Sequence, residues 1–501
     1  METSLSRRTL WMLTPLWTGA IVMTLELAAS RLYAPYFGFS IYVWGTLLAV
    51  VMLALAVGYA VGGYWADRCQ SDRLLYTLIL VSAVYQLMLI PFAGPVLSCL
   101  TAYGDFVGTS VATILLFAPP LLTLAAVGPF VIRLLTRAER VGAWAGTVYA
   151  VSTLGSILGA CLTSYVLIPQ FGTHFTLRSA SVVSASLALL GLVPQARWLW
   201  VAALPAIVLM TPSASPWTKD AVWASESAYN LVRVFRSGQQ TLLALNEDTG
   251  VHTIRNETTL WTGHYYDLYA LGPVFTPVQR ALVLGMGAGG SIHALRAVAA
   301  EVTIDAVEID AQVVEAGTRF FGLPQDADWL HIHVADARPW LARTQQQYDL
   351  VQVDLYQGGP YIPFYLATSE FFSSVHAHLT DKGLLMMNVF DMSPERELLS
   401  AISATVKQVF PSVLVVPHGT ANYMLLAFAQ TQSLPNLRHQ LTEGVVPTSV
   451  FTLARRAAST LTEVHPPQGT PVFTDDHAPI EALTRRMLRE HKRVVTAQVR
   501  M

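Results

Sequence analysis

Long runs of apolar residues fill the first 215 positions of the chain and set the pattern of its N-terminal half. A run of about 20 apolar residues is long enough to cross a bilayer as a helix. Seven candidate runs centre on residues 11–30, 41–63, 74–92, 107–127, 143–168, 177–193 and 198–212. The last is short and contains Pro205, so it is the weakest candidate. We therefore expect an α-helical transmembrane bundle of about seven spans over residues 1–215.

Small residues recur in the fifth of these runs at a spacing that suits close contact between helices. Ser152 and Ser156 are four positions apart, and so are Gly155 and Gly159. Small residues let helix backbones approach one another where lipid supplies no hydrophobic driving force. The pattern predicts a compact bundle rather than a set of separate anchors.

The pattern changes after residue 215 to short strands, glycine turns and amphipathic helices. Alternating residues between positions 225 and 245 predict a small β subdomain, which with a linking helix occupies residues 216–275. Four further apolar runs, at 281–284, 302–307, 331–334 and 350–353, each end at a glycine cluster or a carboxylate. These runs predict an α/β domain with a parallel, nucleoside-binding sheet over residues 276–430, followed by a helical extension over residues 431–501.

Composition narrows the classes of partner. Hydrophobic residues make up 53% of the chain and charged residues only 13%, against roughly 25% charged in soluble proteins. The net charge of -2 gives no basic surface for nucleic acid. Cys69, Cys99 and Cys161 have no metal or disulfide spacing, and His331 and His333 have no further ligands beside them, so we expect no metal.

A glycine turn follows the first strand of the predicted sheet. Gly285, Gly287 and Gly289 would allow backbone amides to approach a ligand closely. Glu308 ends the next strand 23 residues after Gly285. A carboxylate at this distance from such a turn commonly accepts the hydroxyl groups of a ribose. The arrangement predicts a nucleoside site, and a plain turn with a surface acid is the simpler alternative.

Two more carboxylates end the following strands. Asp336 stands where an adenine amino group could bind, and Ala337 leaves room for the ring. Asp354 ends the fourth strand. Because the carboxyl ends of these strands meet in one crevice, Glu308, Asp336 and Asp354 would repel one another unless a ligand offset their charge. We therefore expect a hydroxyl-rich and preferably cationic small molecule.

Residues 225–428 resemble the spermidine synthases, or polyamine aminopropyltransferases. The resemblance implies a small β domain followed by an α/β Rossmann-like, methyltransferase-type domain. The matching pieces are SAYNLVRVF, Tyr265-Tyr266-Asp267, LGMGAGG, VEID, ADA and YDLVQVD. With the apolar N-terminal half and the closing segment FTDDHAP, residues 473–479, the whole chain is similar to membrane-bound spermidine synthase-like proteins. In that closing segment we expect Asp475 and Asp476 to cap the basic C-terminal helix, because acids favour a helix N-terminus.

The resemblance implies a transferase that moves an aminopropyl group from decarboxylated S-adenosylmethionine to an amine and releases methylthioadenosine. Asp354 matches the catalytic aspartate, and Asn230 stands where the family has a glutamine near the nucleoside. We expect nucleoside contacts at Asn230, Gly285, Gly287, Gly289, Glu308, Asp336 and Ala337. We expect substrate contacts at Tyr265, Tyr266, Asp267, Tyr356 and Gln357.

The chain departs from the family on the acceptor side. Ala288 and Gln357 stand where the family has aspartates, and Tyr266 and Asp267 stand where it has His and Glu. Losing two carboxylates weakens the field that would select a polyamine. A methyltransferase that uses S-adenosylmethionine itself is therefore a second hypothesis. A third is a transporter or sensor that binds a nucleoside or polyamine without turnover, because Glu26 lies within the first apolar run.

The basic residues beside the predicted spans indicate orientation. Arg7, Arg8, Arg68 and Arg73 fall on one side, and Arg31 falls on the other. By the positive-inside rule the N-terminus is cytoplasmic. Seven spans would then leave the second half outside, unless residues 198–212 lie in the interface or re-enter, which we favour. We expect a multi-pass inner-membrane protein with a cytoplasmic catalytic domain, whose partners are a small-molecule amine or polyamine, the lipid bilayer and a second copy of the chain.

Overall fold

The computed structural model describes residues 5–38, 40–136, 141–192, 220–246, 250–357 and 359–499. The chain divides into two compact units. The first comprises Met1–Asp220 with Glu226–Ala228, and the second comprises Ala221–Ser225 with Tyr229–Met501.

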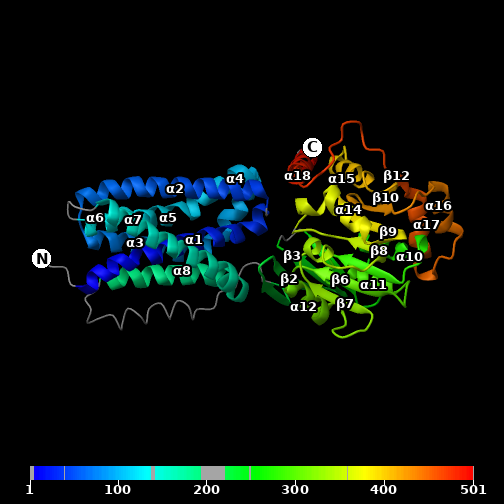
Figure 1. Ribbon diagram of the computed structural model, residues 1–501, viewed down its shortest axis with the longest axis horizontal. Coiled ribbons are helices and arrows are strands. Elements are labelled where there is room, and N and C mark those ends of the chain that lie inside the picture. Colours follow the sequence, from blue (N-terminus) through cyan, green and yellow to red (C-terminus); the bar gives the residue numbers. More distant parts are fainter. Residues whose placement is uncertain are drawn as a thin grey trace. The chain divides into compact units, whose positions relative to one another are not determined.

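The N-terminal unit is built from helices that run alongside one another (Figure 1). Helix α1 contacts α7 and α8, and α3 contacts α8. The helices are α1 (Leu5–Phe37), α2 (Ile41–Arg68), α3 (Asp72–Leu100), α4 (Gly104–Leu116), α5 (Ala118–Ala125), α6 (Val127–Leu135), α7 (Val141–Leu162) and α8 (Ile168–Leu192). A short π-helical segment, Thr163–Leu167, joins the last two.

The described residues contain five helical stretches long and apolar enough to cross a membrane, so the expected count of seven is not confirmed. One of the five, Val141–Leu192, contains two of the predicted spans and is broken at Gly172, where φ is 80°. The predicted span at 107–127 is not one helix. It is divided at Phe117 into α4 and α5, and α5 has proline in its first turn, where a missing N–H donor ends the preceding helix. The candidate at 198–212 lies outside the described residues.

Close packing of α1 against α7 confirms the prediction from the small residues. A Cβ atom added at Gly155 would lie 1.9 Å from the Leu16 carbonyl oxygen, and one at Gly159 would lie 2.4 Å from that of Ala20. Both distances are far below van der Waals contact, so only glycine fits at these two positions. Helix α7 therefore approaches α1 backbone to backbone.

A four-stranded sheet with the order β1-β2-β3-β4 begins the C-terminal unit. Its strands are β1 (Trp223–Glu226), β2 (Leu231–Ser237), β3 (Gln240–Leu245) and β4 (Val251–Asn256), and the pairs β2/β3 and β3/β4 are antiparallel. Helix α12, Ala311–Phe320, packs against this sheet through Val313 and Ala316, which share a buried cluster with Val232 and Leu243.

The described part of this unit also contains an eight-stranded sheet with the order β12-β10-β11-β9-β8-β5-β6-β7. Its strands are β5 (Arg280–Leu284), β6 (Thr303–Glu308), β7 (Leu330–Val334), β8 (Tyr348–Val353), β9 (Leu379–Phe390), β10 (Ser412–His418), β11 (Asn422–Phe428) and β12 (Thr462–Glu463). Strands β5 to β9 are parallel, and β10 to β12 are antiparallel. The strand order reverses between β5 and β8, which is where open α/β sheets hold their ligands.

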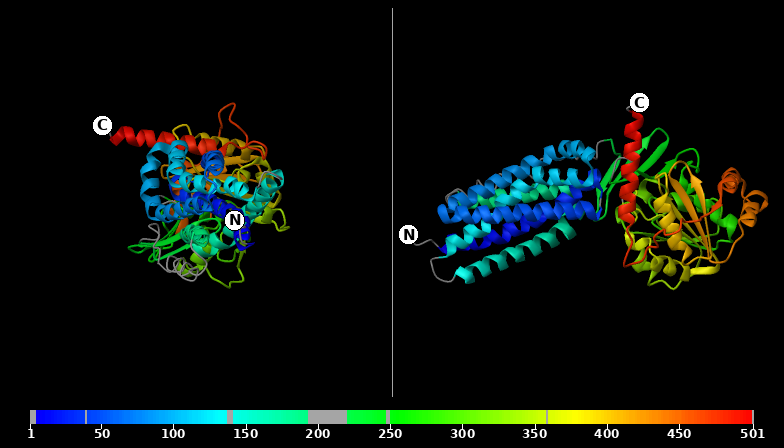
Figure 2. Two further views of the ribbon diagram at one scale, coloured as in Figure 1. Left: turned by 90° about the vertical axis from the view of Figure 1, so that its left-hand side faces the viewer. Right: turned by 90° about the horizontal axis from the view of Figure 1, so that it is seen from above.

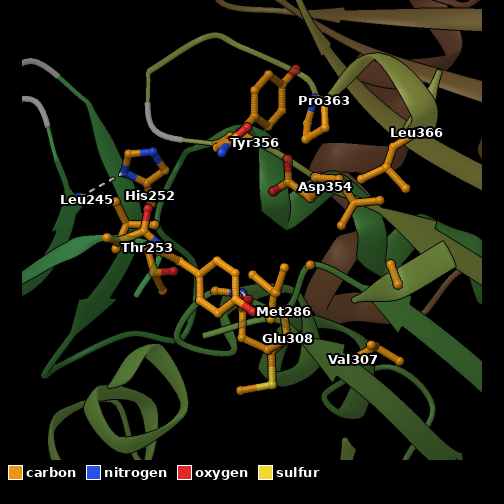
Figure 3. A pocket seen from close by; sticks show the side chains of 18 of the residues that line it. Leu245, His252, Thr253, Met286, Val307, Glu308, Asp354, Tyr356, Pro363 and Leu366 are labelled. Carbon is orange, nitrogen blue, oxygen red and sulfur yellow. Dashed lines mark hydrogen bonds between the residues drawn. The ribbon is translucent and has the colours of Figure 1, made fainter. Parts of the chain in front are cut away.

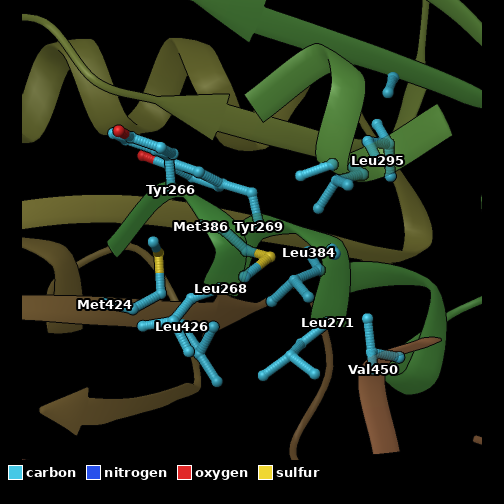
Figure 4. Close-up of a cluster of buried hydrophobic side chains, with 14 of the residues drawn as sticks. Tyr266, Leu268, Tyr269, Leu271, Leu295, Leu384, Met386, Met424, Leu426 and Val450 are labelled. Carbon is cyan, nitrogen blue, oxygen red and sulfur yellow. The ribbon is translucent and has the colours of Figure 1, made fainter. Parts of the chain in front are cut away.

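Helices cover both faces of this sheet, which is why its central strands are apolar on both sides. One face packs against the 3-10 helix η5 (Tyr265–Leu271), α11 (Gly290–Arg296), α16 (Leu434–Glu443) and α17 (Phe451–Thr460). Figure 4 shows Tyr269 and Leu271 of η5 among Met386 and Leu426 of the strands on this face. The other face packs against α13 (Ala337–Leu341), α14 (Ser369–Ala377), α15 (Glu397–Lys407) and the start of α18 (Ile480–Val499). The far end of α18 projects from the unit (Figure 2).

Candidate functional site

A cavity of about 380 Å³ lies at the carboxyl ends of β5, β6 and β8. All of the predicted site residues line it except Gly289 and Asp267. Figure 3 shows two groups in its wall, with Asp354 beside Tyr356 and Pro363, and Glu308 beside Met286 and Val307. The site therefore has two parts: one follows β8, and the other lies at the ends of β5 and β6.

The glycine turn connects β5 to α11. Where the strand order reverses, the backbone of this turn lies against the backbone at the end of β8. Gly285 has φ 78°, and a Cβ atom there would lie 2.3 Å from the carbonyl oxygen of Asp354. Gly289 has φ 91° and faces Leu323, 2.4 Å from where its Cβ atom would lie. Gly289 is thus required for packing at the start of α11, and the structure places it outside the cavity wall, contrary to the expected ligand contact.

Glu308 ends β6 with its carboxylate against the glycine turn. Gly287 N donates to one carboxylate oxygen at 3.1 Å, and Asp310 N donates to the other at 3.2 Å. Burial raises the pKa of Glu308 to about 7, although both hydrogen bonds act in the opposite direction. The charged form of Glu308 is therefore costly without a ligand, and further donors in the cavity would stabilise it.

Asn230 lies before β2 and is held by two neighbouring side chains. Its amide nitrogen donates to Asp310 at 2.8 Å, and its amide oxygen accepts from Asn246 at 2.8 Å. Asp310 also caps α12 by accepting from Gln312 N. The network fixes Asn230 in the cavity wall and ties the small sheet to the end of β6.

Asp336 begins α13 and is engaged at both carboxylate oxygens. One accepts from Arg338 N at 3.0 Å as a helix cap, and the other accepts from the Tyr365 hydroxyl at 2.8 Å. Tyr365 lines the cavity as well. Nothing in the local sequence indicated this tyrosine as the partner of Asp336, because the contact joins segments 29 residues apart.

Asp475 is not a helix cap, so this expectation was wrong. Helix α18 begins five residues later, at Ile480, and the carboxylate of Asp475 instead accepts two hydrogen bonds from the Arg338 guanidinium, at 2.8 and 2.6 Å. Arg338 also donates to the Tyr365 carbonyl oxygen at 2.8 Å. Arg338 lowers the pKa of Asp475. A segment predicted to be structural therefore braces the wall that holds Asp336.

Asp354, at the end of β8, is clamped by two side chains. The Tyr265 hydroxyl donates to Oδ2 at 2.8 Å, and Asn388 Nδ2 donates to Oδ1 at 3.2 Å. Burial raises the pKa of Asp354 to about 6, although both hydrogen bonds act in the opposite direction. The sequence prediction did not include Asn388. The available signal was a lone amide in the apolar run MMNVF of β9, the strand beside β8.

Tyr356 and Gln357 follow Asp354 in the loop after β8. The Tyr356 ring lines the cavity, and its hydroxyl accepts from Phe390 N at 2.9 Å and donates to the Asn388 carbonyl oxygen at 3.1 Å. Gln357 lines the cavity but is exposed. The tyrosine thus closes the wall and anchors the loop to β9.

The side chain of Asp267 is hydrogen-bonded within its own loop and does not line the cavity. Its carboxylate accepts from Thr262 N, Thr262 Oγ1 and Gly263 N at 2.9, 3.0 and 2.7 Å. Tyr265 and Tyr266, which precede it, both line the cavity. The expected substrate contact of Asp267 is therefore not seen, because the first turn of η5 directs this side chain back into its own loop.

Comparisons with known proteins agree with this architecture. Residues 270–439 match the spermine/spermidine synthase domain family. A probable polyamine aminopropyl transferase of Bifidobacterium longum is 30% identical over 301 residues, which cover 55% of this chain and 66% of that protein. Polyamine aminopropyltransferase 2 of Aquifex aeolicus is 20% identical over 427 residues, which cover 80% of this chain and 84% of that protein.

A methyltransferase also matches. The N-terminal histidine N-methyltransferase of Emericella nidulans is 35% identical over 140 residues, which cover 27% of this chain and 24% of that protein. The domain match and the aminopropyltransferase relatives support a transferase. The chain carries a spermine/spermidine synthase domain and is a homologue of the polyamine aminopropyltransferases, with an N-terminal region of helices long and apolar enough to span a membrane.

Proposed function

We propose that this protein transfers an aminopropyl group from decarboxylated S-adenosylmethionine to an amine and releases methylthioadenosine. The observation that supports this most is the clamped carboxylate of Asp354 in the same cavity as Glu308 and the glycine turn. A nucleoside held at one part of the cavity would present its sulfonium side chain to the other.

The nucleoside part follows from the groups present. Glu308 would accept the two ribose hydroxyls, which would offset the cost of its buried charge. Asp336 would accept from the adenine amino group beside Ala337, in a wall held by Tyr365. The amides of the glycine turn would contact the sulfonium side of the ligand.

The reaction is a direct displacement at carbon. The amine nitrogen attacks the carbon next to sulfonium, a C–N bond forms, and the C–S bond breaks with its electron pair staying on sulfur. An ammonium has no free electron pair, so the amine must first lose a proton. Asp354 is the base in this scheme. Its pKa of about 6 means that it is mostly ionised near neutral pH and can still accept a proton from the amine.

Tyr265 and Asn388 act through Asp354. Each donates to a different carboxylate oxygen, so together they fix the orientation of the carboxylate. In this scheme, neither residue carries the negative charge or accepts the proton of the amine. Both are positioning residues, and their value lies in holding the base near the attacking nitrogen.

Purified full-length protein in detergent, mixed with decarboxylated S-adenosylmethionine and a panel of amines, tests the proposal through methylthioadenosine release. We expect Asp354→Asn to lower kcat by roughly 10²- to 10⁴-fold, the usual contribution of a general base, with nucleoside affinity retained. In the unaltered protein kcat/KM should rise with pH through about 6, because the base must be ionised. The exposed Asp326→Asn is the matched control. If the protein neither binds the nucleoside nor releases methylthioadenosine, the proposal is refuted.

The second candidate function is methyl transfer from S-adenosylmethionine itself. Two observations favour it: Ala288 occupies the turn position where the resembled family has an aspartate, and a methyltransferase matches at 35% identity. Affinities for the carboxylated and decarboxylated nucleosides, measured side by side by calorimetry, separate the two. Tighter binding of S-adenosylmethionine with methylated product would select this alternative.

We further propose that the N-terminal unit lies in the inner membrane, with the N-terminus and the catalytic domain on the cytoplasmic side. The supporting observations are the apolar helical stretches and the arginines at the ends of the first three. The fifth stretch, Val141–Leu192, is broken at Gly172 and is long enough to cross twice, which would give an even number of crossings. A cytoplasmic domain would have direct access to a nucleoside substrate.

A further inference from the structure

A second cavity, of about 360 Å³, adjoins the nucleoside cavity. Tyr265, Tyr356 and His252 line both. Asn388, which donates to Asp354, lines the second cavity. Asp354 itself lines the nucleoside cavity, and the second cavity is lined by the two side chains that hold its carboxylate, Tyr265 and Asn388.

We propose that the second cavity takes a monoamine with an uncharged, partly apolar body, and that a polyamine is a poor acceptor. This inference rests on the proposed aminopropyl transfer and names its acceptor class. Acceptor specificity is decided by what surrounds the part of the amine that does not react.

The described residues lining this cavity include no Asp, Glu, Lys or Arg. Their polar groups are the side chains of His252, His264, Asn388 and Asn422 and the two tyrosines. His252 accepts from Leu245 N at 3.3 Å, and burial lowers the pKa of His252 to about 4, so it is neutral at pH 7. A second ammonium would lose its hydration here without an anionic partner, which is strongly unfavourable.

Apolar side chains supply the rest of the wall. Val251, Phe390, Met392 and Leu488 line the cavity, and they come from β4, the end of β9, the loop after it and α18. An alkyl chain would be buried against them. Each buried methylene should improve kcat/KM roughly fourfold, the factor that the transfer of one methylene out of water gives.

One carboxylate, that of Asp354, is enough to balance the single positive charge of a monoamine acceptor. The acceptor enters as an ammonium and gives one proton to Asp354. Its free amine then forms the C–N bond, and methylthioadenosine leaves as the C–S bond breaks. Asp354 can compensate one positive charge at the reacting end, and no described residue of the second cavity compensates another.

The test compares acceptors of equal length on full-length protein with decarboxylated S-adenosylmethionine. We expect kcat/KM for n-pentylamine to exceed that for 1,4-diaminobutane at least tenfold, and to rise from n-propylamine to n-pentylamine. Equilibrium binding of the same amines in the presence of methylthioadenosine should show the same order. A preference for the diamine in either measurement overturns the inference.

The variant Asn422→Asp adds one negative charge to the wall of the second cavity and leaves the shape of the side chain almost unchanged. It should raise kcat/KM for the diamine relative to the monoamine at least tenfold. The same change at the exposed Asn436 is the control and should leave the ratio unchanged. An unchanged ratio in Asn422→Asp counts against the second cavity as the acceptor site.

Glu247 and Asp248 precede Gly250 of the cavity wall in the chain and lie outside the described residues. The double variant Glu247→Gln, Asp248→Asn therefore belongs in the same assay, and we expect the monoamine preference to be unaltered. Methylthioadenosine release with the diamine preferred refutes the acceptor class alone. No release with any amine, together with no nucleoside binding, refutes the proposed function itself.

Discussion

The two carboxylates that matter most, Glu308 and Asp354, have raised pKa values for the same reason and are held in different ways. Burial raises both. Backbone N–H groups hold Glu308, whereas the side chains of Tyr265 and Asn388 hold Asp354. Glu308 is therefore fixed by the fold of the turn, and Asp354 depends on two individual residues that substitution can remove.

Glu308→Gln should stabilise the ligand-free protein and weaken nucleoside binding. A buried acid whose pKa is raised from 4.5 to about 7 loses stability as the pH rises through that window, because the folded state keeps its proton longer than the unfolded state. Removing the charge should gain about 1–3 kcal/mol at pH 8 and little at pH 4. The lost charge-assisted hydrogen bonds to ribose should lower affinity roughly 10- to 100-fold.

Thermal denaturation in detergent at the two pH values, with and without methylthioadenosine, measures both effects. The exposed Glu301→Gln is the control. A variant that is less stable at pH 8 and binds the nucleoside normally would contradict the role of Glu308.

At the scale of elements, the segment at residues 473–475 ties three helices to the nucleoside wall. Phe473 is buried in the core, its N–H donates to Thr405 of α15, and its carbonyl oxygen accepts from Ser369 N at the start of α14. Asp475 then pairs with Arg338 of α13. The segment lies more than 100 residues after the wall in the chain and acts on it only through the folded structure.

Asp475→Asn should raise KM for the nucleoside roughly three- to tenfold with kcat nearly unchanged, because it loosens Arg338 and Tyr365 without touching the base. The pair is partly exposed, so we expect a loss of about 1 kcal/mol or less in the free energy of unfolding. The neighbouring, exposed Asp476→Asn is the matched control. An equal fall in kcat for both variants would argue against a positioning role for Asp475.

Much of the element plan was predictable because the signals are local. Apolar runs predicted at 281–284, 302–307, 331–334 and 350–353 correspond to β5, β6, β7 and β8. The division of the run at 107–127 was missed, because hydropathy alone does not register that proline begins a new helix at this point. Asn388 was missed because its partner Asp354 lies on a neighbouring strand.

At the scale of the whole molecule, the chain joins a helical unit to an α/β unit, and the orientation of the first can be tested with its own cysteines. Cys69 follows α2, Cys99 lies near the end of α3, and both are exposed. With a cytoplasmic N-terminus, α1 and α2 return the chain to the cytoplasm and α3 leaves it.

A membrane-impermeant maleimide applied to intact spheroplasts should therefore label a variant that keeps only Cys99. A variant that keeps only Cys69 should be labelled only after the spheroplasts are lysed. Cys161, near the end of α7, is replaced in both variants. The reverse pattern would place the N-terminus outside and would remove the support for a cytoplasmic nucleoside site.

The sequence by itself determined the helical N-terminal half, the strand positions of the catalytic sheet and the glycines and strand-end carboxylates that line the nucleoside cavity. These features were predictable because hydropathy, glycine turns and strand-end carboxylates are encoded over a few consecutive residues. Tertiary structure decided the rest. Only packing joined Asn388 to Asp354, Tyr365 to Asp336 and Asp475 to Arg338. It also turned Asp267 away from the cavity and assembled a second one from β4, β9 and α18. These contacts join segments far apart in the chain, and their geometry follows from how the layers pack.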